Sequence, residues 1–311
     1  LASYYAHPLR CLPAYPLRSY PSTMITLREL TKVFGTQTAV GGLSLEIPAG
    51  QIVGFLGPNG AGKSTTLKMI TGMLKPTSGT AIIAGHDLTT DPMAVKRSVG
   101  FVPESGALYE SLSGLEYLRM VASLYGIAAE QADARIAEFI QFFDLTWDVL
   151  TEKLLAAYSK GMRRKIVIIS ALLHNPPVLL FDEPLDGLDV NAAMGFKTLI
   201  QTLAKQGRTI VYSSHILDVV EKVCDRVVII NQGKLVLDGV LPTATLFTSR
   251  PVRTVGHMVT QDMVEIWRSG SFAKDPPNAT VAAFSKDGAV IRDAVVVLKN
   301  PVMDGDKLAF E

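Results

Sequence analysis

The sequence lacks a cysteine framework, a charge imbalance and any long apolar run. Its two cysteines, Cys11 and Cys224, lie far apart among 311 residues, which argues against disulfides and favours a reducing compartment. Lys and Arg number 30 and Asp and Glu 29, so no basic field points to nucleic acid as a partner. No uninterrupted apolar run reaches the roughly 20 residues that span a bilayer. Any role at a membrane is therefore expected to pass through a partner protein.

The first 23 residues contain no acidic side chain, and four prolines interrupt their apolar stretches. This composition differs from the apolar centre of a signal peptide. The first methionine is Met24, and the alternating pattern of a strand begins there. Residues 1–23 are therefore predicted to be a disordered or non-native leader. The alternative is a short tail that docks on the folded domain.

Residues 57–64 read Gly-Pro-Asn-Gly-Ala-Gly-Lys-Ser, the pattern of a phosphate-binding loop between a strand and a helix. Glycines let backbone N–H groups turn toward phosphate oxygens, and the helix N-terminus adds the positive end of its dipole. Lys63 supplies a point charge for the β- and γ-phosphates, and Ser64 supplies a hydroxyl for Mg²⁺. A tight turn before a helix, the alternative interpretation, would need neither. The residues predicted to bind nucleotide here are Gly57, Asn59, Gly60, Gly62, Lys63, Ser64 and Thr65.

Two adjacent acids, Asp182 and Glu183, end a continuous apolar run that begins at Val178. Because side chains alternate along a strand, the two carboxylates point differently and can play different parts. Asp182 is predicted to reach Mg²⁺, and Glu183 to polarise a water for attack on the γ-phosphate. A solvated strand end is the alternative, and the preceding phosphate loop argues against it.

Two more segments carry polar residues at the ends of predicted elements. His215 follows the strand pattern at 209–213, on the sheet edge where open α/β sheets bind ligands, so it is predicted to contact the γ-phosphate or the attacking water. Ser159 is a good N-cap for the helical pattern that follows it. Taken alone, residues 158–165 would indicate only a helix start with a solvated basic turn.

The pattern along the chain predicts an α/β fold with a parallel sheet, an antiparallel β edge and an inserted helical subdomain at about residues 104–170. Continuous apolar runs are typical of parallel strands buried on both faces, and alternating ones of a half-buried antiparallel sheet. The predicted strands lie at 25–30, 43–47, 80–84, 99–102, 178–181, 209–213 and 226–230. Beyond about residue 240 the texture changes, and residues 241–311 are predicted to form a C-terminal extension with short strands at 280–284, 293–298 and 308–311.

In this order, the motifs of residues 24–239 resemble the ATP-binding subunits of ABC transporters, and in particular the single-domain ATPases of bacterial exporters of drugs, sodium ions and antibiotics. Phe34 falls where that family has an aromatic residue that stacks on adenine. Residues 57–64 correspond to its Walker A loop and residues 178–182 to its Walker B strand. The resemblance implies that Glu183 is the catalytic glutamate and His215 the switch histidine.

The resemblance also covers the D-loop and the signature motif, with departures. Asp189 matches the D-loop, and Ser159 and Gly161 match the signature. Lys160 stands where the signature has its first glycine, while Tyr158 and Met162 replace a leucine and a glutamine. Glu104 takes the place of the Q-loop glutamine. A carboxylate there can still bind Mg²⁺ or orient water, although it adds negative charge near the γ-phosphate.

The resemblance implies a mode of assembly. Two subunits face head to tail, so that the signature of one closes on Mg-ATP held by the loop of the other, and hydrolysis releases them. The implied partners are an integral membrane permease and a second copy of this chain, with no nucleic acid. The implied location is the cytoplasmic face of the inner membrane, where the chain is peripheral, and the helical region is the part expected to dock on the permease.

Three alternatives follow from the same motifs. A soluble ABC-type ATPase that remodels ribosomes would usually carry two such cassettes, and only one is visible here. A chromosome-maintenance ATPase would separate the loop from the signature by a long coiled coil, and no such heptad run exists. A damaged ATPase that binds without turnover is disfavoured by intact Glu183 and His215.

The first prediction concerns Lys63, whose charge is expected to face the β- and γ-phosphates. Lys63→Ala should weaken ATP binding roughly tenfold or more, the consequence of losing a charge-assisted contact of about 1.5–3 kcal/mol, and should abolish turnover. Nucleotide affinity and phosphate release measure the two effects. Unchanged affinity and hydrolysis in the variant would show that residues 57–64 are not a phosphate loop.

Overall fold

The computed structural model describes residues 21–106, 108–216, 220 and 223–231. Farther along it describes the backbone of seven strands, at residues 234–237, 243–247, 255–259, 278–284, 290–297, 302–304 and 307–310. Residues 1–20, which carry most of the predicted leader and Cys11, lie outside the described residues.

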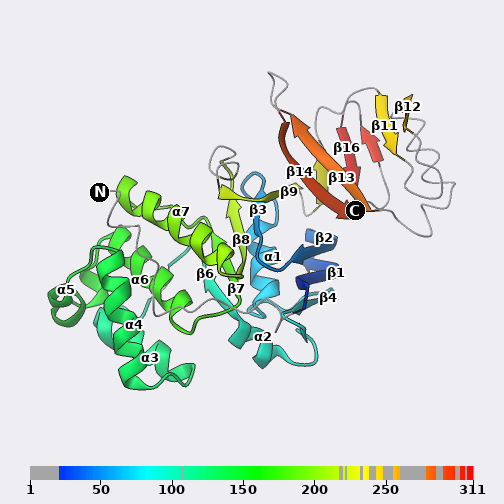
Figure 1. Cartoon of the computed structure of the whole chain (residues 1–311). Helices are drawn as coiled ribbons and strands as arrows, with labels where there is room; N and C mark the ends of the chain where they lie inside the picture. The colour runs from blue at the N-terminus through cyan, green and yellow to red at the C-terminus, as the bar shows by residue number, and fades with distance from the viewer. Residues whose placement is uncertain are drawn as a thin grey trace.

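A parallel sheet forms the centre of the fold (Figure 1). Its strands lie in the order β9-β3-β8-β7-β6, and each neighbouring pair runs parallel. The bounds are β3 (Ile52–Leu56), β6 (Val99–Val102), β7 (Val178–Asp182), β8 (Thr209–Ser214) and β9 (Arg226–Asn231). Every residue of β7 and β8 is buried, as the continuous apolar runs predicted.

The two faces of this sheet pack against different layers, because successive side chains of a strand point to opposite sides. Val178 and Leu180 belong to a core with α1 (Lys63–Ile70) and the antiparallel sheet. Leu179 and Phe181 belong to a second core with α6 (Lys160–Leu173) and α7 (Val190–Lys205). Helix α2 (Pro92–Ser98) adds Val95 to the first core.

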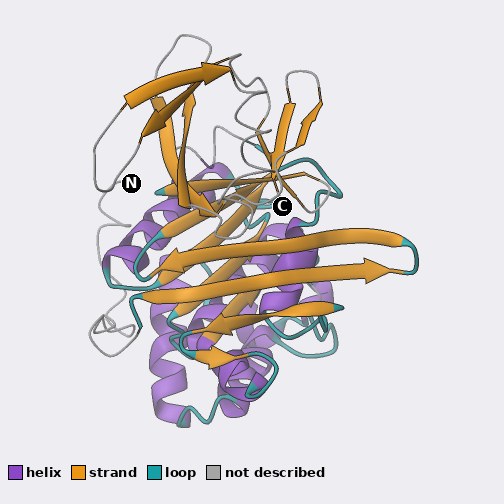
Figure 2. Cartoon of the chain, turned by 90° about the vertical axis from the view of Figure 1, so that its right-hand side faces the viewer, coloured by secondary structure: helices purple, strands orange, loops and turns teal. Residues whose placement is uncertain are grey.

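The antiparallel sheet has the strand order β2-β1-β4-β5, and its two longest strands cross the front of the molecule in Figure 2. Its strands are β1 (Thr23–Phe34), β2 (Gln37–Pro48), β4 (Ser78–Ile83) and β5 (His86–Asp87). Both long strands extend beyond the predicted ranges 25–30 and 43–47, since a two-residue turn joins them directly. The predicted antiparallel edge is confirmed.

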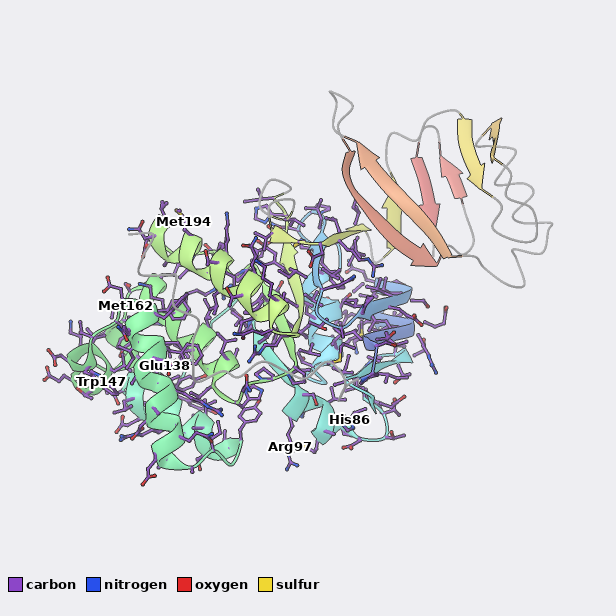
Figure 3. All side chains as sticks on the ribbon, viewed as in Figure 1. His86, Arg97, Glu138, Trp147, Met162 and Met194 are labelled. Carbon is purple, nitrogen blue, oxygen red and sulfur yellow. The ribbon has the colours of Figure 1, made fainter. Side chains whose placement is uncertain are left out.

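Helices α3 (Gly114–Leu124), α4 (Ala129–Phe142) and α5 (Trp147–Glu152) form the helical group, next to α6 in Figure 1. A short 3-10 turn, Leu155–Ala157, leads from it to α6. Trp147 and Glu138 mark this group in Figure 3, whereas His86 and Arg97 lie on the side of the antiparallel sheet.

The apolar residues of α3 differ in exposure: Leu118 is buried, but Leu124 is 77% exposed. Residues four apart share a helix face, so Ala122 takes the inward position after Leu118, and the helix ends at Leu124 itself.

The central sheet continues into the predicted C-terminal extension. Strand β10 (Lys234–Leu237) pairs with β9 and, on its other side, with β16 (Lys307–Phe310), which pairs with β15 (Val302–Asp304). Two further hairpins join β11 (Thr243–Phe247) to β12 (Val255–Val259) and β13 (Asn278–Phe284) to β14 (Val290–Val297). The backbone hydrogen bonds of the sheet therefore cross the boundary expected near residue 240.

The second prediction follows from this pairing. Removing residues 302–311 leaves the outer edge of β10 without its partner strand, and an unpaired edge favours association between chains. We expect a melting temperature lower by on the order of 3 °C and more aggregation on heating. Mg-ATP should still raise the melting temperature, because β3 and α1 are unaffected. An unchanged melting curve would show that β16 does not stabilise the sheet.

Candidate active site

The phosphate loop joins β3 to α1 and is packed too tightly for larger residues at two positions. A Cβ atom on Gly57 would lie 2.0 Å from the Ile230 carbonyl oxygen. Gly62 has a φ of +100°, in the left-handed region that favours glycine, and a Cβ there would lie 2.5 Å from the Ala39 carbonyl oxygen. Ile230 of β9 and Ala39 of β2 thus pack against the backbone of the loop, and glycine is needed at both positions.

Lys63 is buried at the start of α1, and its ammonium lies over the loop. The Nζ atom donates to the carbonyl oxygens of Gly57, at 2.6 Å, and Pro58, at 3.1 Å. An ammonium has three N–H donors, so these bonds orient the charge and leave one donor for a phosphate oxygen.

A cleft lies in front of the loop. A cavity of about 310 Å³ is lined by residues 59–65 together with Glu104 and Glu183. A second cavity of similar volume shares Asn59, Glu104 and Glu183 with the first and reaches His215. Four segments that are distant in the sequence therefore meet, and they bring together most of the residues predicted for nucleotide chemistry.

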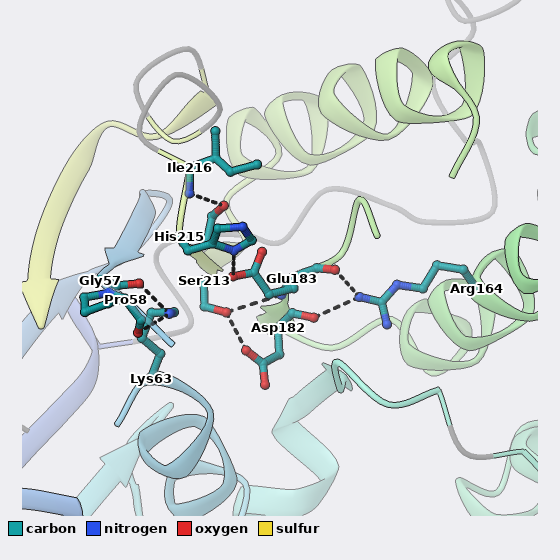
Figure 4. Close-up of polar contacts among 10 residues, drawn as sticks. Gly57, Pro58, Lys63, Arg164, Asp182, Glu183, Ser213, His215 and Ile216 are labelled. Atoms are coloured by element: carbon teal, nitrogen blue, oxygen red, sulfur yellow. Dashed lines mark hydrogen bonds and ion pairs between the residues drawn. The ribbon is translucent and has the colours of Figure 1, made fainter. Parts of the chain in front are cut away.

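Asp182 ends β7 directly beside Ser213 of β8 (Figure 4). The Ser213 hydroxyl donates to Asp182 Oδ1 at 2.5 Å. Asp182 is 1% exposed, and its Oδ2 has no hydrogen-bond partner among the described residues. A buried carboxylate oxygen without a partner is costly, and a hard cation such as Mg²⁺ would satisfy it. The donor set thus fits a divalent cation.

Glu183 and His215 face each other across the carboxyl ends of β7 and β8 (Figure 4). Glu183 Oε1 lies 2.8 Å from His215 Nδ1, and the carboxylate is mostly shielded from solvent while the imidazole is half exposed. Glu183 has a φ of +45°, which is strained for a residue with a side chain. Its N–H donates to the carbonyl and the hydroxyl oxygen of Ser213, both at 3.3 Å, which holds this turn.

Besides Gly57, which begins the loop, four predicted nucleotide-binding residues do not line the cleft: Phe34, Ser159, Gly161 and Asp189. Phe34 is half exposed at the end of β1, with the Lys32 ammonium 5.0 Å above its ring.

The other three gather at the starts of α6 and α7. Ser159 caps α6 by accepting from Met162 N–H, and Asp189 caps α7 by accepting from Ala192 N–H, which lowers the pKa of Asp189. Gly161 lies against the Gly187 carbonyl, where a Cβ would come within 2.8 Å. Beside it, Lys160 Nζ lies 2.9 Å from the Asp186 carboxylate.

The sequence reasoning missed two residues of the site. Ser213 belongs to a motif that was singled out for His215, and its register opposite Asp182 follows only from the pairing of β7 with β8. Arg164 lies in a segment that, taken alone, would indicate a solvated basic turn, but its side chain is 4% exposed. Its position five residues after the N-cap, before a run of buried residues, is the only local signal of burial.

The fold and the site define a nucleotide hydrolase of the phosphate-loop class, with a loop, a metal-competent aspartate and a glutamate–histidine pair around one cleft. Comparison with known proteins narrows the class. The family model described as ABC transporter matches residues 40–186. The ABC transporter ATP-binding protein NatA of Bacillus subtilis is 38% identical over 224 residues, which span 70% of this chain and 90% of that protein.

Another relative and a solved structure are also ATP-binding proteins of transporters. The bacitracin transport ATP-binding protein BcrA of Bacillus licheniformis is 40% identical over 215 residues, which span 69% of each chain. A solved ATP-binding subunit of an ABC transporter is similar with a TM-score of 0.65 and 33% identity, over 68% of this chain and 88% of that one. The chain belongs to the ATP-binding proteins of ABC transporters, and it is the ATPase subunit of such a transporter.

The third prediction concerns Ser213. Ser213→Ala removes the hydroxyl that orients Asp182, so the Mg²⁺ concentration for half-maximal ATP hydrolysis should rise about tenfold, as for other residues that support a metal ligand. A titration of the hydrolysis rate with Mg²⁺ measures it. Ser214→Ala is the matched control, because the Ser214 hydroxyl accepts from Ile216 N–H instead. Equal Mg²⁺ dependence of both variants and wild type would remove Ser213 from the site.

Proposed function

We propose that the cleft binds Mg-ATP with its phosphates on the loop and its γ-phosphate facing Glu183. The pair of Glu183 and His215, 2.8 Å apart at the cleft that the loop lines, is the observation that carries the proposal. Lys63 and the N–H groups at the start of α1 bind the phosphates. Ser64 and Asp182 would hold Mg²⁺, with Glu104 at the same cleft. The cation, when bound, neutralises charge on the phosphate oxygens.

In this proposal Glu183 accepts a proton from the attacking water. An ionised carboxylate only accepts hydrogen bonds, so the proton of the His215 contact lies on Nδ1. This bond occupies Oε1 and leaves Oε2 for the water. It also directs the other ring nitrogen of His215 away from Glu183, and that nitrogen donates to the γ-phosphate only when the ring carries both protons. Because the strained backbone of Glu183 is held by Ser213, its carboxylate needs little rearrangement before reaction.

We propose that two copies of the chain form the complete site. Ser159, Gly161 and Asp189 lie together at the starts of two helices but outside the cleft that holds the loop. A second copy facing head to tail would place them on ATP bound by the first. Support comes from a solved dimeric ABC transporter cassette, MJ0796, which is 26% identical with a TM-score of 0.64 over 68% of this chain.

The dimer is proposed to power export through a separate permease at the cytoplasmic face of the inner membrane. The names of two relatives, the daunorubicin/doxorubicin resistance protein DrrA and the linearmycin resistance protein LnrL, support export. None of the described helices is long and apolar enough to cross a membrane. Leu124, Trp147 and Leu154 are apolar residues of this region that are exposed, and such side chains would favour docking on a partner. The alternative is a soluble ABC-type ATPase that remodels ribosomes or other macromolecules.

We propose that the ATPase domain spans residues 24–240, with the helical subdomain at about 104–170, and that residues 241–311 form an extension. Strand β16 of this extension pairs with β10 of the central sheet.

The fourth prediction tests the base and the dimer together. Glu183→Gln keeps the size of the side chain but cannot accept the proton, so ATP hydrolysis should fall about 100-fold or more while ATP still binds. Unhydrolysed ATP should then hold two chains together, which size-exclusion chromatography with Mg-ATP detects as a dimer.

Glu104→Gln is the matched control, because it makes the same change at the other carboxylate of the cleft. It should alter the rate only modestly and should not trap a dimer. A Glu183→Gln variant with normal turnover would move the base elsewhere. A variant that is inactive but stays monomeric with ATP would refute the homodimer.

A further inference from the structure

Arg164 lies in the first turns of α6 and is almost fully buried, although no carboxylate of the described residues is bonded to it. All five N–H donors of its guanidinium bond to backbone carbonyl oxygens. Nε donates to Pro184 at 3.1 Å, Nη1 to Pro103 at 2.5 Å and Glu104 at 3.4 Å, and Nη2 to Asp182 at 2.8 Å and Glu183 at 2.5 Å. Figure 4 shows the contacts to the last two residues.

These five carbonyls belong to two segments that leave neighbouring strands. Residues 103–104 follow β6, and residues 182–184 end and follow β7. Each segment carries a carboxylate that lines the nucleotide cleft, Glu104 in one and Glu183 in the other. A single side chain therefore sets the distance between the two backbone segments that present these carboxylates.

Of the residues that Arg164 contacts, Glu183 has a strained backbone. Its φ of +45° costs free energy and persists only where the surroundings hold it. Ser213 holds the N–H of Glu183, and Arg164 holds its carbonyl oxygen. Without Arg164, only the hydrogen bonds from the Glu183 N–H to Ser213 would hold this turn.

Few other side chains could do this. Arginine presents five donors in a rigid planar fork, whereas lysine has three donors on a flexible stem and glutamine has two. Burial lowers the pKa of Arg164, and the nearby Asp186 and Asp182 oppose that shift. The geometry is thus specific for a guanidinium.

We propose that Arg164 is a positioning residue for ATP hydrolysis. It fixes the backbone of Glu104 and Glu183 at a set distance from each other and links both segments to helix α6. The inference rests on the proposed role of Glu183 as the base. Because α6 begins with the signature residues Ser159 to Gly161, any shift of this helix start is passed through Arg164 to the backbone of the base. Arg164 is not among the residues that line the nucleotide cleft, so it is expected to act on the rate and not on nucleotide affinity.

The test compares Arg164→Lys and Arg164→Gln with the same changes at Arg163. Arg163 is the matched control, since it lies one residue away and pairs with Glu110 at 2.7 Å, outside the cleft. We expect kcat for ATP hydrolysis to fall about 10- to 100-fold in the Arg164 variants, with KM changed less than about threefold. The Arg163 variants should stay within about threefold of wild type in both constants.

Two further measurements separate positioning from a general loss of structure. Free guanidinium, at concentrations far below those that unfold proteins, should restore part of the rate of Arg164→Ala but not of Arg163→Ala. Amide hydrogen exchange of the nucleotide-free chain should become faster around Glu104 and Glu183 in Arg164→Gln, with the rest of the sheet unchanged. This readout does not depend on turnover, so it stands even if Glu183 is not the base.

Three outcomes would overturn the proposal. The first is a normal kcat in both Arg164→Lys and Arg164→Gln. The second is a rise in KM that accounts for the whole loss of kcat/KM, which would place Arg164 in nucleotide binding. The third is unchanged hydrogen exchange around both glutamates. Wild-type turnover, measured first, tests the proposed function separately.

Discussion

Parallel pairing of β3, β8, β7 and β6 is the constraint on which the rest of the site depends. Parallel strands end at the same edge of a sheet, so the residues that follow them meet there. The phosphate loop follows β3, the Glu104 segment follows β6, and Glu183 and His215 follow β7 and β8. Pairing also sets the register, which places Asp182 opposite Ser213. A shift of one residue between β7 and β8 would separate the aspartate from its hydroxyl partner and turn it to the other face.

The cleft concentrates negative charge, and the structure places the cationic side chains of Lys63 and Arg164 beside it. Asp182, Glu104 and Glu183 lie at or beside a site meant for a polyphosphate. Lys63 faces the site from the loop, and the metal expected at Asp182 Oδ2 would add positive charge beside it. Arg164 lies behind both acidic segments and bonds only to their backbone, so its charge stabilises the site without occupying it. These placements explain how Asp182, Glu104 and Glu183 can lie near one another at one edge of the sheet.

The sequence by itself determined the elements whose signal is local. The loop at residues 57–64 combines a strand, a glycine-rich turn and a helix start in one short segment, so its structure and its phosphate chemistry could both be predicted. The buried runs that became β7 and β8 were also recognisable, because strands covered on both faces need continuous apolar residues. The family followed from the order of such motifs, and the comparisons confirm it.

Tertiary structure alone decided which distant residues meet. Arg164 lies among basic neighbours and looks solvent-facing in sequence, and only the approach of α6 to the ends of β6 and β7 buries it among five carbonyls. The bond from Ser213 to Asp182 depends on strand register, and the pairing of β16 with β10 joins segments about 70 residues apart. Packing also decides the exposure of Leu124, which faces solvent because Ala122 takes the position of α3 that packs on the core after Leu118. Periodicity specifies which face of an element is apolar, but only packing between elements specifies what that face touches.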